Sequence, residues 1–139
     1  MIASSMAGKP KLFFLQAGQG HDKMEAGEVP ERDAPEPLKD PFNDIEVGEV
    51  LPNEADFLLG YATVPGYVTF RSRNQGTWFI CKLCEMLGKY AHREHLIEIL
   101  TRVNKEVAKL DANVDGGRFK QVPSPMYTLR YKLYLKPMK

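Results

Sequence analysis

A short apolar run that stops at two glycines constrains the fold of this chain more than any other feature. Residues 12–17 read Leu-Phe-Phe-Leu-Gln-Ala, and Gly18 and Gly20 follow at once. A run without polar alternation is typical of a strand that is covered on both faces. In open α/β sheets, ligands and catalytic groups gather at the carboxyl ends of such strands. We therefore predict a strand over about 11–17 and a candidate site at its end.

The size and charge of the chain describe one ordinary globular unit. It has 139 residues, of which 43% are hydrophobic and 27% charged, with a formal net charge of +1. We treat residues 1–139 as a single domain. Lys and Arg are spread along the chain, so we expect no nucleic-acid partner. No run approaches the roughly 18 apolar residues of a membrane span, and the two cysteines suit a reducing compartment. We expect no membrane partner and a cytoplasmic location.

The other predicted elements follow from hydrophobic periodicity. A second buried strand is predicted over about 57–64, where Pro65 and Gly66 end it. Apolar residues spaced by three and four predict helices over about 77–88, with Thr77 as N-cap, and over about 94–110. Strict alternation predicts a third, half-exposed strand over about 126–135. Residues 71–76 and 111–117 are predicted to be loops.

One long segment separates the first two strands. Residues 19–50 contain four prolines, many acidic residues and few aromatic ones. Such a segment cannot bury enough apolar surface to offset its ordering entropy, so we predict a disordered linker. The resulting order of strand, linker, strand, helix, helix and strand indicates an α/β half-sandwich, whose first strand lacks a partner on its outer side.

Four blocks of sequence resemble the caspases, a family of aspartate-specific cysteine proteases. The blocks are residues 7–17, 52–64, 67–71 with 76–80, and 99–107. In order and spacing they are similar to the last strand of the caspase large subunit followed by the small subunit, most of all in the death-receptor initiator caspases. The resemblance implies a caspase-like small-subunit (p10-type) fold, a place in apoptosis or death-receptor signalling, and no cofactor. Most of the large subunit has no counterpart in this sequence.

Gly18 stands where the resemblance places the nucleophile. Residues 16–20 read Gln-Ala-Gly-Gln-Gly against the family signature Gln-Ala-Cys-x-Gly. Glycine offers no nucleophile, and the family's catalytic histidine belongs to the unmatched large-subunit portion. His21, His92 and His95 do not lie at its position. We therefore predict no catalytic residue and no protease activity of the chain alone.

The resemblance also implies that part of a substrate pocket is retained. Arg71 and Gln16 match residues that hold the substrate aspartate, and a guanidinium binds a carboxylate bidentately. Phe70 and Trp78 match aromatic walls, and Ser72 lies in the strand that pairs with the peptide main chain. The second arginine of the pocket is unmatched, so only weak binding of aspartyl peptides is expected. The alternative is that Arg71 and Trp78 are inherited from the family and bind no substrate in this chain.

Two further features of the family map onto this chain. Asp33 and Asp44 fall near the sites at which caspases cut their own linker, which makes them candidate processing sites. In caspases the last strand pairs with its counterpart across a two-fold axis, so this strand is a candidate contact with a second copy or with an initiator caspase. The residues of that contact are Tyr127, Leu129, Tyr131 and Leu133.

One set of cysteines and histidines is a candidate metal site. Cys81 and Cys84 precede His92 and His95, and these residue types suit zinc. The gap between the two pairs is short, however, and small buried cysteines on a helix are the simpler interpretation. We predict no metal.

Three functional hypotheses follow. The first is a catalytically inactive caspase homologue that acts by protein–protein association. The second is the small-subunit part of a genuine protease whose nucleophile has been replaced by Gly18. The third is a module that binds aspartyl peptides through Arg71 and Gln16.

Overall fold

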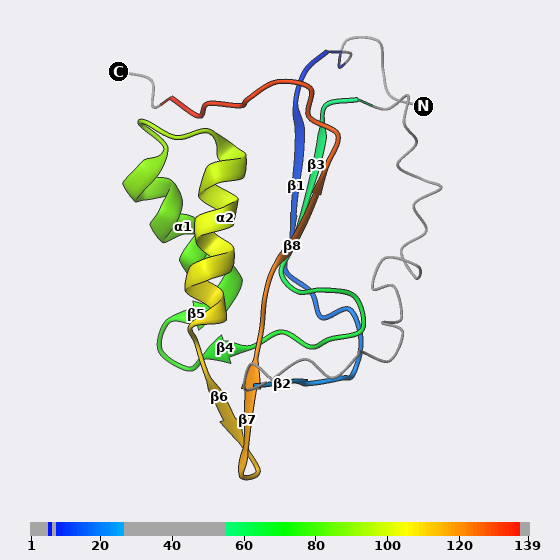
Figure 1. Cartoon of the computed structure of the whole chain (residues 1–139), viewed down its shortest axis with the longest axis vertical. Helices are drawn as coiled ribbons and strands as arrows, with labels where there is room; N and C mark the ends of the chain where they lie inside the picture. The colour runs from blue at the N-terminus through cyan, green and yellow to red at the C-terminus, as the bar shows by residue number, and fades with distance from the viewer. Residues whose placement is uncertain (1–5, 7, 27–54, 137–139) are drawn as a thin grey trace, which may run out of the picture.

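The computed structural model describes residue 6, residues 8–26 and residues 55–136. Within these ranges the chain forms two α-helices and eight strands (Figure 1). In chain order they are β1 (Lys11–Leu15), β2 (Met24–Glu25), β3 (Phe57–Tyr61), β4 (Arg71–Ser72), β5 (Gly76–Thr77), α1 (Trp78–Tyr90), α2 (Leu96–Ala108), β6 (Ala112–Val114), β7 (Gly117–Lys120) and β8 (Ser124–Tyr127).

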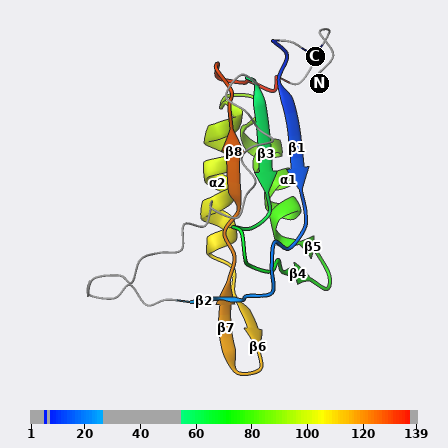
Figure 2. The same cartoon turned by 90° about the vertical axis from the view of Figure 1, so that its right-hand side faces the viewer.

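The main sheet has three strands in the order β1-β3-β8 (Figure 2). β1 and β3 run parallel, with Leu12 beside Leu58 and Leu15 beside Tyr61. β8 runs antiparallel to β3 on its other side. Within the described ranges β1 and β8 are therefore the two edge strands of this sheet. β1 and β3 both point their carboxyl ends toward the loop that follows Gln16.

The two helices cover one face of this sheet (Figure 1). Their buried side chains, among them Phe79, Met86 and Val103, form one apolar core with Leu58 of β3 and with Ala62, which directly follows β3. The spacing of apolar residues by three and four, which predicted the helices, is the pattern that faces this core. Among the described residues, neither helix has the length and apolar character needed to cross a bilayer.

The two helices, with β1 and β3, confirm the predicted mixed α/β class, although the ends of these elements differ from the predicted ends by a few residues. α1 begins after Thr77 as expected, although the Thr77 side chain makes no capping hydrogen bond. His95 caps α2, because its side chain accepts from the backbone N–H of Glu98. β3 ends at Tyr61 rather than at residue 64. Beyond it, the backbone leaves the sheet to form the loop crossing described below.

The predicted last strand over 126–135 is wrong in its extent. β8 spans only Ser124–Tyr127. After it, Leu129, Leu133 and Leu135 pack against the core, and the carbonyl of Leu133 accepts from the N–H of Leu96 at 2.8 Å. The segment thus crosses onto the start of α2 instead of continuing in the sheet. Its apolar alternation reflects this anchoring on the helices.

Three short structures lie where loops or linker were predicted. β2, within the predicted linker of 19–50, pairs with β7, so that prediction is wrong for its first residues, and residues 27–50 lie outside the described ranges. β4 and β5 form a hairpin within 71–77. β6 and β7 form another, whose turn at Asp115 and Gly116 has φ values of 50° and 79°. Asp-Gly is the usual signal for such a turn, and it lay within the segment interpreted as a loop.

Candidate functional site

The loop after β1 is held by a backbone crossing with residues 66–68. Gln19 donates its N–H to the Tyr67 carbonyl at 2.9 Å and accepts from Gly66 N–H at 3.1 Å. Asp22 makes the matching pair, donating to the Gly66 carbonyl at 3.1 Å and accepting from Val68 N–H at 2.9 Å. The Gln19 side chain adds a 2.6 Å bond from Nε2 to the Thr63 carbonyl. The loop that carries position 18 is therefore fixed in place by main-chain hydrogen bonds.

Two glycines of this loop differ in what they permit. A Cβ placed on Gly20 would lie 2.2 Å from the carbonyl oxygen of Gly66, so the crossing requires glycine there. A Cβ on Gly18 would meet Val68 Cα at 3.7 Å and Thr69 N at 3.8 Å, which are ordinary contacts. Position 18 is also exposed. The loop can therefore carry a side chain at the position that matches the caspase nucleophile.

The Gln121 side chain links the chain just after β3 to Phe70, whose ring lies beside that of Trp78. It is 1% exposed, its Oε1 accepts from the N–H of Phe70 at 2.8 Å, and its Nε2 donates to the carbonyl of Ala62 at 2.7 Å. The ring centroids of Phe70 and Trp78 are 5.1 Å apart, and Trp78 N–H donates to the Phe70 carbonyl at 3.1 Å. Both aromatic residues are thus held by the chain beyond the end of β3.

The predicted carboxylate-binding residues lie on two separate elements. Gln16 follows β1 directly, and its Oε1 is buried without a hydrogen-bond partner among the described residues. Arg71 lies in the exposed hairpin strand β4, opposite Thr77. No carboxylate in the part of the chain that the structure describes forms an ion pair with Arg71. Ser72, beside it, accepts from Asn74 N–H at 3.4 Å. A shared contact of Gln16 and Arg71 with one carboxylate stays a prediction.

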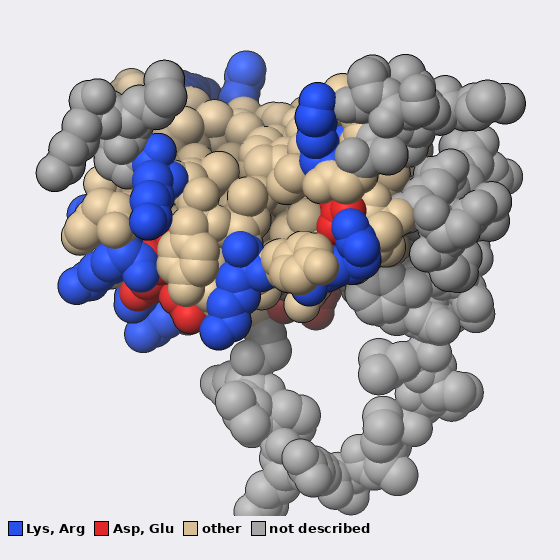
Figure 3. Space-filling view, turned by 90° about the horizontal axis from the view of Figure 1, so that it is seen from above, with Lys and Arg blue, Asp and Glu red and all other residues tan. Residues whose placement is uncertain are grey.

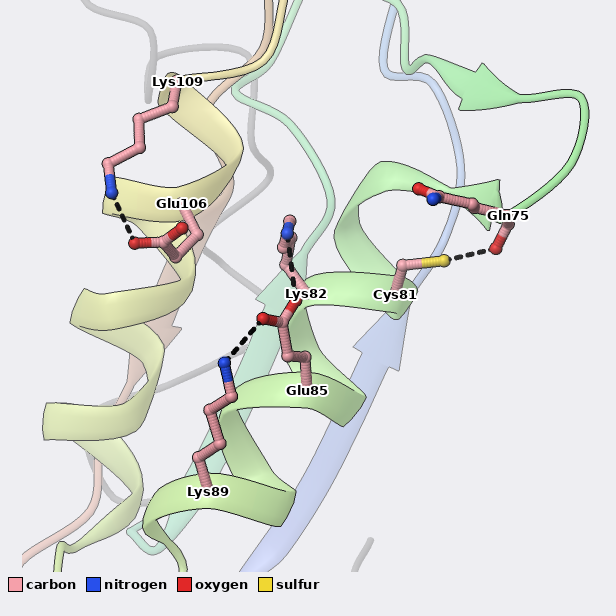
Figure 4. Close-up of polar contacts among 7 residues, drawn as sticks. All are labelled: Gln75, Cys81, Lys82, Glu85, Lys89, Glu106 and Lys109. Atoms are coloured by element: carbon pink, nitrogen blue, oxygen red, sulfur yellow. Dashed lines mark hydrogen bonds and ion pairs between the residues drawn. The ribbon is translucent and has the colours of Figure 1, made fainter.

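A cavity of about 420 Å³ opens between this hairpin and the first turns of α1. The residues that line it include Ser72, Trp78, Cys81, Leu110 and Asp111. The Cys81 thiol donates to the Gln75 carbonyl of the hairpin (Figure 4). Two residues predicted to form the substrate-like pocket, Ser72 and Trp78, thus line this cavity.

An ion-paired row borders the cavity on the surface of α1 (Figure 4). Glu85 accepts from Lys82 and from Lys89, each at 2.9 Å. These hydrogen bonds, with that of Lys82 the largest cause, lower the pKa of Glu85 to about 2. On α2, Glu106 pairs with Lys109 at 2.8 Å. Two lysines share the single carboxylate of Glu85, so this row keeps a net positive charge and Glu85 stays ionised beside the cavity.

The candidate metal residues are not gathered into one site. Among the described residues, no three His, Cys, Asp or Glu side chains lie where they could hold a metal ion. His95 contacts Glu98 through both ring nitrogens, Nδ1 to the backbone N–H and Nε2 to the carboxylate at 3.0 Å. The interpretation of both cysteines as buried is wrong, because Cys84 is exposed and Cys81 is only partly buried and donates to the Gln75 carbonyl.

The outer edge of β8 is the second candidate surface. Within the described ranges β8 pairs only with β3. Thr128 N–H donates inward to the Phe57 carbonyl at 2.7 Å, and successive N–H groups of a strand point to opposite edges. The N–H of Tyr127 therefore points outward, and Pro125, which would be the other outward donor of β8, has no N–H. Tyr127 supplies the sole outward donor of β8.

The four predicted contact residues divide into two kinds. Tyr127 and Tyr131 are 50% and 76% exposed, whereas Leu129 and Leu133 pack against the core. Beside β8, His95, Tyr127, Tyr131 and Lys132 border a cavity of about 300 Å³. Only Tyr127 of the four lies within a strand. As a strand edge, the candidate contact surface is therefore shorter than predicted, and its exposed members are Tyr127 and Tyr131.

The pair Asp56–Arg130 braces the start of β3. Asp56 is 4% exposed and has φ = 72°, and Nη2 of Arg130 lies 2.8 Å from its Oδ2. The hydrogen bond from Arg130 is the main reason why the pKa of Asp56 is lowered. The carbonyl of Asp56 accepts from Lys11 N–H, and its N–H donates to the Thr128 carbonyl. This residue thus links all three strands of the main sheet.

Sequence reasoning missed three residues that organise the sites: Gln121, Asp22 and Asp56. Gln121 lies in a short polar–apolar stretch with no periodic signal, and its role depends on partners 51 and 59 positions away. Asp56 was noted only within a matching block.

Comparison with known proteins agrees with this geometry. The model of the caspase domain matches residues 1–134. The chain belongs to the caspase family. Among similar proteins, caspase-8 of Rattus norvegicus is 42% identical over 137 residues, or 96% of this chain and 28% of that protein. Caspase-3 of Bos taurus is 41% identical over 134 residues, covering 94% of the chain and 46% of that protein. Caspase-7 of Gallus gallus is 37% identical, with 94% and 42% covered.

This caspase-family chain therefore corresponds to part of its relatives. It spans between 28% and 46% of the length of these three proteins. The match accounts for the half-sandwich of a three-stranded sheet under two helices. It also confirms the resemblance drawn from the four sequence blocks and the relation to cysteine endopeptidases.

Proposed function

We propose that this chain is a catalytically silent caspase homologue that acts by associating with another protein through β8. The observation that carries the proposal is the combination of Gly18 on an ordered loop with an open strand edge at Tyr127. Cysteine-protease catalysis needs a nucleophile and a base within hydrogen-bond reach, and position 18 has no side chain. An edge strand, by contrast, can add a strand of a second chain through main-chain hydrogen bonds.

The partner in this proposal is an initiator caspase or a second copy of the chain. The setting is apoptosis, in death-receptor signalling, in the cytoplasm. Arg71, in its exposed hairpin, retains the fork geometry for one carboxylate of an aspartyl peptide, and weak binding of such a peptide accompanies the association. Asp33 and Asp44 remain candidate processing sites, both outside the described residues.

The test removes the outward donor of β8. Tyr127→Pro deletes this N–H and leaves the hydrogen bonds between β8 and β3 in place, whereas Tyr127→Ala removes the ring and keeps the N–H. A pull-down on immobilised caspase-8 catalytic domain should recover wild type and Tyr127→Ala but much less Tyr127→Pro. Circular dichroism of all three proteins checks that they fold. Equal recovery of Tyr127→Pro and Tyr127→Ala would rule out association through this edge.

The second candidate function is the small-subunit part of a genuine cysteine protease with Gly18 in place of the nucleophile. The observation that favours it is the ordinary spacing of 3.7–3.9 Å around a Cβ at position 18. Gly18→Cys should then fold unchanged, and a thiol there should acquire peptidase activity only when a histidine-bearing caspase portion is added. Activity of that mixture on an aspartyl peptide supports this candidate, and its absence leaves the association proposal.

A further inference from the structure

The charge around β8 bears on which partner the edge accepts. From Gly116 to the end, the sequence has no Asp or Glu, while it carries Arg118, Lys120, Arg130, Lys132, Lys136 and Lys139. β8 lies in the middle of this stretch. Figure 3 looks onto the end of the molecule where the chain leaves β8, and there lysine and arginine are more prominent than acidic residues.

Part of this positive charge is neutralised from other elements. Asp111 pairs with Arg118 at 2.9 Å and also with Lys120, and Asp56 pairs with Arg130 at 2.8 Å. Lys132 and Lys136 form no ion pair with any residue that the structure describes. Both are exposed, and Lys132 borders the tyrosine-lined cavity beside β8. The flanks of β8 therefore keep an excess of positive charge.

A two-fold contact would bring these flanks together. When two copies of a strand pair antiparallel about a two-fold axis, the segment after the strand in one copy runs beside the segment before it in the other. Here the unpaired charge of Lys132 in one copy would lie toward Arg118 and Lys120 of the other, whose two positive charges are offset only in part by the single carboxylate of Asp111. Like charges that face each other across an interface cost affinity and act against that partner.

We propose that β8 is a heterotypic edge: it selects a partner strand flanked by acidic side chains and disfavours a second copy of this chain. The inference rests on the proposed function, because it presumes association through β8. It adds the chemistry of the partner, namely carboxylates beside the strand that pairs with Tyr127. The tyrosines then provide the contact area, and the lysines decide between partners.

The test uses a charge-reversed variant of this chain as the partner with an acidic flank. Lys132→Glu reverses one flanking charge, and Lys105→Glu makes the same change at an exposed lysine on α2. Sedimentation velocity would measure dissociation constants for wild type alone, for wild type mixed with each variant, and for wild type with caspase-8 catalytic domain. At low salt, wild type with Lys132→Glu should associate about tenfold more tightly than wild type alone, and wild type with Lys105→Glu should not. The gain should shrink at high salt.

The outcomes separate the inference from the proposed function. If wild type self-associates at low salt as tightly as it binds Lys132→Glu, the charge selection is wrong, while association through β8 stands. If Lys105→Glu gives the same gain, net charge rather than the β8 flank is responsible, and the inference fails. If no mixture associates, including the one with caspase-8, the proposed function fails and the inference fails with it.

Discussion

Replacing Gly20 by alanine should unfold the loop that carries position 18, whereas the same change at Gly18 should not. The added Cβ at position 20 would lie 2.2, 2.5 and 2.7 Å from the O, C and Cα atoms of Gly66. Ordinary contacts of carbon begin near 3.5 Å, so one backbone segment must move by about 1 Å. The atoms that the new Cβ meets belong to the main chain of Gly66, so the clash cannot be relieved by rotating a side chain.

The cost follows from the hydrogen bonds of the crossing. Overpacking alone costs about 1–3 kcal/mol, and each disturbed main-chain hydrogen bond adds about 1 kcal/mol. The substitution should disturb two hydrogen bonds, from Gln19 to Tyr67 and from Gly66 to Gln19. We therefore expect Gly20→Ala to lower the free energy of unfolding by about 3–5 kcal/mol. For a domain of this size, such a loss lowers Tm by roughly 10 °C or more.

Gly18→Ala is the matched control. Its Cβ has ordinary contacts, and alanine reduces the entropy of the unfolded chain, so stability should change by less than about 1 kcal/mol. Thermal and denaturant unfolding followed by circular dichroism measures both variants. A Gly20→Ala protein as stable as wild type, or a Gly18→Ala protein as unstable as Gly20→Ala, would refute the described loop geometry.

Three further predictions concern stability. The hydrogen bond from Arg130 lowers the pKa of Asp56 below its usual 3.8. The stabilisation of the fold by this ion pair is therefore present above pH 3.8 and is lost as the pH falls below that value. Asp56→Asn should lower Tm at pH 7, and the difference in Tm from wild type should disappear in acid. Asp111, held at a pKa of about 2 chiefly by Arg118, should lose its stabilising effect between about pH 4 and 2, and Asp111→Asn should flatten that part of the Tm–pH curve. Phe79 is 1% exposed, so Phe79→Ala should cost about 3–5 kcal/mol in urea unfolding, and a cost below 1 kcal/mol would contradict the described core.

The elements that sequence reasoning found are those with local causes. Both helices follow from apolar spacing toward one face, and β1 and β3 follow from apolar runs ended by glycine or proline. The half-sandwich and the outer position of β1 were predicted on this basis. The expectation that β1 is covered on both faces is wrong, however, because Leu12 and Phe14 pack against the core while Phe13 and Leu15 are 49% and 37% exposed.

The errors arose where distant residues decide the structure. Alternation after Tyr127 indicated a strand, but the N–H of Leu96 binds the Leu133 carbonyl, and the leucines pack on the helices. β2 depends on pairing with β7, nearly a hundred residues later. Gln121 bridges Phe70 and Ala62 through contacts that leave no periodic trace. A functional site at the end of β1 stays a prediction, and the residues that hold the loop there had no local signal in the sequence.

The most direct test of the account combines catalysis and association in one assay. Hydrolysis of an aspartyl peptide would be followed for the chain alone, for caspase-8 alone, and for caspase-8 with increasing amounts of wild type or Tyr127→Pro. We predict no hydrolysis by the chain alone, a change in the caspase-8 rate that saturates with wild type, and no such change with Tyr127→Pro. Hydrolysis by the chain alone, or an equal effect of wild type and Tyr127→Pro, would contradict a function by association through β8.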